Sequence, residues 1–308
     1  MRITKNPPIC RKYCIFFYKH LQQNCIEKIN SLTETMQQTL HNLLHQITAK
    51  KGQITVLTGA GISAESGIPT FRGPEGYWTV GSKVYHPQEM ATFAMFSQMP
   101  DEVWKWYLYR MGICRQAIPN AGHYALVQME KSLLDRFTII TQNVDGLHLR
   151  AGNSLARTLQ IHGNVDFMRC ALECTDEVFP IPAGVAPKGK DDPLSETDRA
   201  LLRCPKCGAK SRPHVLLFDE CYNEQHYHFY SALAVAKKTD LLLVVGTAGA
   251  TNLPNQVAGE VFRKGGAIVD INVEANPFSQ LAEQSANGFF YCSPSASALP
   301  QVAKILVQ

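Results

Sequence analysis

The chain reads Ile54-Thr55-Val56-Leu57-Thr58-Gly59-Ala60-Gly61, an aliphatic and β-branched run that ends in a glycine-rich turn. The run predicts a buried strand, and the Gly-x-Gly turn lets backbone N–H groups approach a pyrophosphate without interference from Cβ atoms. Arg72 follows farther along as a fixed cation suited to a phosphate oxygen. The third glycine of the usual dinucleotide fingerprint is missing, so a glycine-rich turn with a surface arginine explains the same residues.

Three further apolar runs predict strands at 137–141, 241–245 and 267–271, and polar residues follow each of them. Those residues are Gln142-Asn143-Val144-Asp145, Gly246-Thr247 and Asn272. Helical patterns alternate with the strands at 33–50, 101–115, 122–135, 224–237 and 252–264. The alternation predicts an α/β fold with a Rossmann-like, doubly wound parallel sheet. Its carboxyl edge would gather the polar residues at a ligand site.

Residues 165–214 interrupt this alternation and predict a small module inserted into the larger domain. The module holds two cysteine pairs, Cys170 with Cys174 and Cys204 with Cys207, at a spacing that suits one tetrahedral zinc ion. Four thiolates leave no open coordination position, so the zinc would be structural. Four reduced cysteines that only pack together are the alternative.

Composition limits the class of protein. The 308 residues are 45% hydrophobic and 18% charged, with a net charge of +4, which is typical of a globular enzyme and too even to indicate a nucleic-acid partner. No stretch approaches the roughly 20 consecutive apolar residues of a membrane helix. Ten cysteines without a secretory signal favour a reducing, cytoplasmic compartment.

We expect two regions along the chain. Residues 1–32 form an extension that contains none of the motifs and is expected to be flexible, and residues 33–306 form a catalytic domain. The first 26 residues contain no Asp or Glu. A mitochondrial presequence is also poor in acidic residues, although it usually holds more Arg and Ser than this segment does. A disordered or partly helical tail, or a true start at Met36, is the favoured interpretation of the segment.

His162 is a candidate general base, because it follows an apolar run and precedes Gly163, and because a histidine near its normal pKa suits proton transfer at neutral pH. A structural histidine is the alternative. His123 and His148 lie on or beside helical segments and are expected to pack or to face solvent.

The motifs together resemble the sirtuin family over about residues 35–306. They occur in the family's order: Gly59-Ala60-Gly61-Ile62-Ser63 through Phe71-Arg72-Gly73, Thr141-Gln142-Asn143-Val144-Asp145, His162-Gly163-Asn164, the two cysteine pairs, Val245-Gly246-Thr247 and Asn272-x-Glu274.

The resemblance implies NAD-dependent removal of an acyl group from lysine in acylated protein substrates. In that family the acyl oxygen attacks the nicotinamide ribose and expels nicotinamide, a histidine matching His162 acts as base on a ribose hydroxyl, and water releases O-acyl-ADP-ribose. Asn143 and Asp145 would serve the reacting ribose, whose developing positive charge carboxamide and carboxylate groups stabilise. The cofactor-binding residues implied are Gly59, Ala60, Gly61, Ala64, Glu65, Thr70, Phe71, Arg72, Gln142, Asn143, Asp145, Gly246, Thr247, Ala248, Asn272, Glu274 and Ser295.

The choice of acyl group is expected to depend on Tyr107 and Arg110. Residues three apart share a helix face, and a phenol beside a guanidinium suits a carboxylate. The pair resembles the Tyr-x-x-Arg of desuccinylase and demalonylase sirtuins, as do Arg212-Pro213-His214-Val215 and Gly76-Tyr77-Trp78. Succinyl, malonyl or glutaryl chains would then be preferred over acetyl. An aromatic helix that packs on the core, with Arg110 in a salt bridge, is the alternative.

Several positions depart from the family pattern. Asp219 stands where a glycine usually precedes the glutamate, so its carboxylate would repel acidic acyl groups or favour basic peptides. The run Ala248-Gly249-Ala250 lacks the usual serine, and Ser295 takes the position of a cysteine that some relatives place against adenine. An NAD hydrolase or ADP-ribosyltransferase using the same site, and a zinc-ribbon binding module without turnover, are the other functions considered.

Overall fold

The computed structural model describes residues 37–70, 87–190 and 192–307, and its centre is a six-stranded sheet. The strands lie in the order β3-β2-β1-β7-β8-β9, and every pairing is parallel. Their bounds are β1 Ile54–Thr58, β2 Phe137–Thr141, β3 Thr158–Gln160, β7 Leu241–Val245, β8 Ala267–Asn272 and β9 Phe289–Cys292. The chain builds outward from β1 on one side and from β7 on the other, which is the doubly wound order expected of a Rossmann-like sheet. The predicted fold class is confirmed.

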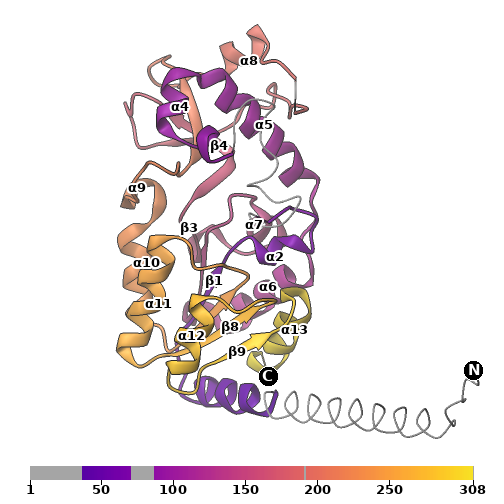
Figure 1. The fold of residues 1–308 in the computed structure, drawn as a ribbon, viewed down its shortest axis with the longest axis vertical. Coiled ribbons are helices and arrows are strands. Elements are labelled where there is room, and N and C mark those ends of the chain that lie inside the picture. Colours follow the sequence, from indigo (N-terminus) through magenta and orange to yellow (C-terminus); the bar gives the residue numbers. More distant parts are fainter. Residues whose placement is uncertain (1–36, 71–86, 191, 308) are drawn as a thin grey trace, which may run out of the picture.

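Helices cover both faces of this sheet (Figure 1). The helix at 37–49 packs on one face together with α6 (Ala121–Leu133) and α13 (Ser295–Leu306). On the other face lie α10 (Phe229–Ala236), α11 (Asn252–Lys264) and α12 (Pro277–Gln284). Because both faces are covered, β1 and β7 are buried along their whole lengths, and this explains why β7 is an unbroken apolar run and β1 is apolar except at Thr55 and Thr58.

One predicted helix is wrong in detail. The pattern at 224–237 forms two helices, α9 (Glu224–Tyr227) and α10, and not one. His228 separates them with a φ of 53°, in the left-handed region that ends a helix. The helix predicted at 252–264 is confirmed at both ends.

A smaller antiparallel sheet, in the order β5-β4-β6, lies toward one end of the long axis with α4, α5 and α8 (Figure 1). The remaining bounds are α2 Gly61–Ala64, α3 Pro87–Met90, α4 Phe93–Gln98, α5 Pro100–Gln116, α7 Leu147–Ala151, β4 Gly163–Cys170, β5 Val178–Pro180, α8 Glu196–Leu201 and β6 Ser211–Val215. The predicted insertion at 165–214 therefore has its own sheet. Its apolar side chains share one cluster with α4 and α5, which come from the segment between β1 and β2.

In the part of the chain that the structure describes, none of the helices combines the length and the apolarity that crossing a membrane requires.

Candidate active site at the carboxyl edge of the sheet

The glycine turn after β1 packs directly against the end of β7. Gly59 donates its N–H to the Val245 carbonyl at 2.9 Å, and Gly61 donates to the Gly246 carbonyl at 2.8 Å. A Cβ on Gly61 would lie 2.6 Å from the Gly246 Cα, closer than any side chain permits. The glycines are thus required by backbone approach between two strands, and their N–H groups are already bonded within the protein. This role differs from the pyrophosphate contact expected of them from the sequence.

Asn143 and Asp145 meet through Ser63, a residue inside the quoted motif to which the sequence assigned no role. Asn143 donates its Nδ2 hydrogens to the Gly59 carbonyl at 3.0 Å and to Ser63 Oγ at 3.1 Å. Ser63 in turn donates to Asp145 Oδ2 at 2.7 Å. Since all three side chains are buried, this chain of hydrogen bonds fixes their orientation and leaves Asn143 Oδ1 as the remaining acceptor of the amide.

Burial raises the pKa of Asp145, while the bonds from the Leu147 N–H and Ser63, and the positive charges of Arg150 and Arg110, work in the opposite direction. Asp145 Oδ1 accepts the Leu147 N–H at 2.8 Å. This contact ties the carboxylate to the start of α7. The carboxylate is therefore held rigidly in a poorly solvated place at the strand edge.

Gln142 directly follows β2 and links that strand to the residues that follow β7. Its Nε2 donates to Thr247 Oγ1 at 2.9 Å, and its Oε1 accepts from Thr251 Oγ1 at 2.8 Å. The polar residues predicted to converge at this edge do so, because β1, β2 and β7 are neighbours in one parallel sheet.

His162 lies between β3 and β4 with both ring nitrogens engaged. Nδ1 is 3.0 Å from the Gln142 carbonyl, which can only accept, so Nδ1 carries the proton. Nε2 is then the acceptor for the Tyr222 hydroxyl at 2.7 Å. Burial lowers the pKa of His162 to about 4, against a smaller opposing effect of the Gln142 carbonyl. The ring is therefore neutral at physiological pH, as a general base must be.

Gly163, after the histidine, has a φ of 83°, and a Cβ there would lie 2.1 Å from the His214 carbonyl oxygen. Close approach of β4 and β6 thus requires this glycine, in addition to any effect on access to His162. His123 and His148 are both buried, which agrees with packing and excludes solvent exposure.

The remaining edge residues hold one another. Asn272 donates from Nδ2 to the Thr247 carbonyl at 2.9 Å, which orders the loop after β7. Glu65 Oε2 accepts from the Ala296 N–H at 2.8 Å and from Ser295 Oγ at 3.2 Å, and so joins the end of α2 to the start of α13.

Exposure differs among the rest of the predicted cofactor-binding residues. Ala64 and Glu274 are exposed, whereas Ala60, Thr70 and Ala248 are half-buried. Phe71, Arg72 and the Gly76-Tyr77-Trp78 motif lie outside the described residues.

Tyr107 and Arg110 lie on α5. Tyr107 is only 4% exposed and packs edge-on against Trp106, with ring centroids 4.9 Å apart. Burial raises the pKa of Tyr107, and the charges of Arg212 and Arg110 oppose that effect. The positive charge of Arg110 opposes the rise in pKa of both Tyr107 and Asp145.

Two acidic residues after β6 have structural partners. Glu220 forms a two-pronged ion pair with the guanidinium of Arg212, whose side chain is 1% exposed. Asp219 accepts the N–H groups of Phe93 at 2.6 Å and Ala94 at 3.0 Å. The carboxylate that departs from the sirtuin pattern is therefore bound to the first turn of α4.

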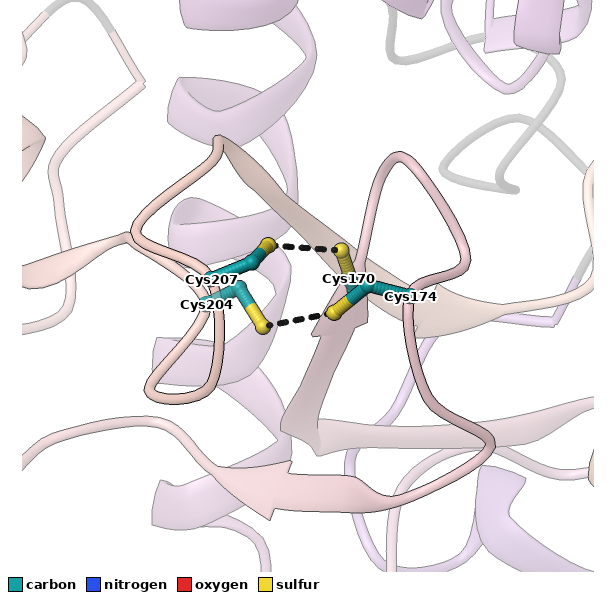
Figure 2. Close-up of side chains that lie close together, drawn as sticks. All are labelled: Cys170, Cys174, Cys204 and Cys207. Carbon is teal, nitrogen blue, oxygen red and sulfur yellow. Dashed lines mark hydrogen bonds between the residues drawn. The ribbon is translucent and has the colours of Figure 1, made fainter.

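The four predicted metal ligands form one cluster (Figure 2). The Sγ atoms of Cys170 and Cys207 are 3.6 Å apart, as are those of Cys174 and Cys204, and all four lie within 4.8 Å of one another. A tetrahedral zinc with bonds of about 2.3 Å would separate its sulfur ligands by roughly 3.8 Å. The donor set and its spacing thus fit one structural zinc ion. The described cysteines are all free of disulfides.

This fold and edge define a protein with a Rossmann-like sheet, a partly buried histidine beside the polar residues of the strand edge, and a four-cysteine module. The family model described as Sir2 family matches residues 59–252, so the chain belongs to the Sir2 family.

Relatives and solved structures agree with this assignment. An NAD-dependent protein deacylase of Leptospira interrogans serogroup Icterohaemorrhagiae serovar copenhageni (strain Fiocruz L1-130) is 38% identical over 82% of this chain and 92% of its own. A Sir2 homolog–NAD complex is similar with a TM-score of 0.68 and 30% identity, over 88% of this chain and 92% of that one. A Sir2 homologue mutant bound to 2'-O-acetyl ADP ribose is similar with a TM-score of 0.66 and 32% identity, over 82% and 91% of the two chains.

Proposed function

We propose that the chain is an NAD-dependent protein lysine deacylase that prefers acidic acyl groups and releases nicotinamide and O-acyl-ADP-ribose. The observation that carries the proposal is the meeting of His162, Asn143 and Asp145 at one sheet edge in a Sir2-family chain. The similarity to proteins called deacylases, and to a homologue that holds an acetylated ADP-ribose, supports it.

NAD supplies a ribose bond that breaks as nicotinamide leaves, with positive charge developing on the sugar. The ionised form of Asp145 and the side-chain oxygen of Asn143 are the groups suited to stabilise that charge, and Ser63 keeps both in place. His162 receives the proton of a ribose hydroxyl at Nε2, because its Nδ1 proton is committed to the Gln142 carbonyl.

We assign binding roles from the order of the family motifs. Ala60, Ala64, Glu65, Thr70, Phe71 and Arg72 would bind the phosphates, with Gly59 and Gly61 fixing the turn through their hydrogen bonds to the end of β7. Gln142 would serve the nicotinamide ribose together with Asn143 and Asp145. The adenosine half goes to Gly246, Thr247, Ala248, Asn272, Glu274 and Ser295. The catalytic domain accordingly comprises 33–306, with the zinc module inside it.

The acidic preference rests on Tyr107 and Arg110. One helical turn separates them, and the charge of Arg110 is felt by both Tyr107 and Asp145. A carboxylate at the end of the acyl chain would thus meet a guanidinium and a phenol near the reacting edge. The Asp219 carboxylate is held at the first turn of α4, where it accepts two backbone N–H groups.

The test compares acetyl-, malonyl- and succinyl-lysine peptides of one sequence, with wild type, Arg110→Met and Lys105→Met. Lys105 is a matched control, because it is a cation on the same helix that pairs with Glu102 at 2.8 Å. We expect Arg110→Met to lose at least tenfold in kcat/KM for the acidic acyl groups and to keep its activity on acetyl-lysine. Equal losses on all three peptides, or equal losses in both variants, would reject the acidic preference.

A further inference from the structure

The Tyr222 hydroxyl is hydrogen-bonded to Nε2 of His162, the nitrogen on which the proposed reaction depends. Nδ1 of His162 donates to a main-chain carbonyl, so Nε2 is the basic position, and Nε2 accepts from Tyr222 at 2.7 Å. A ribose hydroxyl must therefore either displace the phenol or deliver its proton through it. The surroundings of Tyr222 distinguish these two possibilities.

The chain on both sides of Tyr222 is fixed. Two residues earlier, Glu220 is held by the buried guanidinium of Arg212 and also accepts the Leu217 N–H at 2.9 Å. One residue later, Asn223 caps α9 by accepting the His226 N–H at 2.9 Å.

The Tyr222 ring also packs against Phe229, with centroids 6.4 Å apart. These contacts restrict movement of the Tyr222 side chain, which favours a hydroxyl that remains in place as a donor over one that moves aside when substrate binds.

The hydrogen bonds of the phenol continue from His162 to Gln142 and on to Thr251. Gln142 accepts the His162 proton at its main-chain carbonyl, and its side-chain oxygen accepts from Thr251. Burial raises the pKa of Tyr222 to about 12, and hydrogen bonding with Thr251 partly opposes that rise. The phenol is therefore a neutral O–H donor throughout the physiological range, with oxygen lone pairs left to accept a second hydroxyl.

We propose that Tyr222 is a further catalytic residue of this chain that relays the ribose proton to His162, an inference that rests on the deacylase function proposed above. The ribose O–H bond breaks as its proton passes to the phenol oxygen, while the phenol proton passes to Nε2. Tyr222 is unchanged at the end, His162 becomes a cation, and the ribose oxygen becomes the nucleophile. No oxidant, reductant or further reactant is needed.

The test separates the step that needs the base from the step that precedes it. Exchange of labelled nicotinamide into NAD, in the presence of acyl peptide, requires only cleavage and re-formation of the ribose–nicotinamide bond. Net deacylation requires the base as well. Both rates are measured on one preparation of Tyr222→Phe, so their ratio does not depend on the fraction of protein that is folded. Tyr230→Phe is the control, because Tyr230 is 69% exposed.

We expect Tyr222→Phe to keep its exchange rate within about twofold of wild type and to lose at least roughly tenfold in deacylation, a modest share of what proton transfer contributes. Tyr230→Phe should change neither rate. Deacylation that is unchanged or faster in Tyr222→Phe would overturn the relay, since the phenol would then be a place-holder that substrate displaces. A wild-type protein without exchange and without deacylation would reject the proposed function itself.

Discussion

Replacing Glu220 with glutamine should destabilise the protein far more than replacing a surface glutamate does. Glu220 neutralises Arg212, whose side chain is 1% exposed and lies 5.4 Å from the centre of the Phe93 ring. Glutamine leaves that guanidinium buried without a counter-charge, a defect that costs about 3–5 kcal/mol in fully buried pairs. Because Glu220 itself keeps 17% exposure, we expect the lower end, about 3 kcal/mol. A loss of that size lowers the melting temperature by roughly 6 °C in a domain of this length.

The assay is urea unfolding followed by far-UV circular dichroism, with Glu260→Gln as the control. Glu260 pairs with Arg263 at 2.6 Å, but the arginine is 66% exposed, so its loss should cost below about 0.5 kcal/mol. A difference between the two variants smaller than about 1 kcal/mol would refute the reasoning, since burial of Arg212 would then carry no cost.

Three more perturbations have definite outcomes. Gly61→Ala should lower the free energy of unfolding by at least about 2 kcal/mol, because its Cβ would lie 2.6 Å from the Gly246 Cα. Gly259→Ala on α11 has open space around its Cβ and should raise the free energy of unfolding by about 1 kcal/mol. Equal stability of the two variants in thermal unfolding would contradict the close approach at Gly61. Burial lowers the pKa of His148 to about 3, so the unfolded state binds the extra proton between that value and the ordinary 6.5, and stability rises with pH across this window. Urea titrations of His148→Asn at several pH values should therefore show a smaller dependence of the unfolding free energy on pH, by about 1.4 kcal/mol per pH unit near pH 5. An unchanged dependence would contradict the lowered pKa of His148. The purified protein should hold one zinc per chain by elemental analysis, and a chelator should lower its melting temperature until zinc is restored, an effect that Cys207→Ser should abolish; a metal-free protein of the same stability would contradict the cysteine site.

The sequence predicts the central strands well, because buried parallel strands are largely apolar runs. β7 is apolar throughout, and β1, β2 and β8 are apolar except at two positions each. The edge strands β3 and β9 are partly exposed and short, with three and four residues, so β3 carries no such pattern and the apolar run of β9 is brief. The break at His228 depends on a left-handed backbone at a non-glycine residue, which no local pattern announces.

The candidate site shows the same division. Spacing alone identifies the four cysteines, and strand ends bring Asn143 and Asp145 together. Ser63 and Tyr222 escape notice because their importance lies in contacts across 82 and 60 residues of sequence. Asp219 is the opposite case, because the sequence draws attention to it and the structure gives it a local role. The sequence marks it as a departure from the family pattern that affects substrate choice, whereas its partners in the structure are backbone N–H groups of α4.

The most direct test of the deacylase assignment is mass spectrometry of the products formed from NAD with and without a succinyl-lysine peptide. The account predicts that nicotinamide and O-succinyl-ADP-ribose appear in equal amounts only when the acylated peptide is present, and that His162→Asn blocks the second product. Loss of NAD at the same rate without the peptide, giving free ADP-ribose, would contradict the account and make the protein an NAD hydrolase.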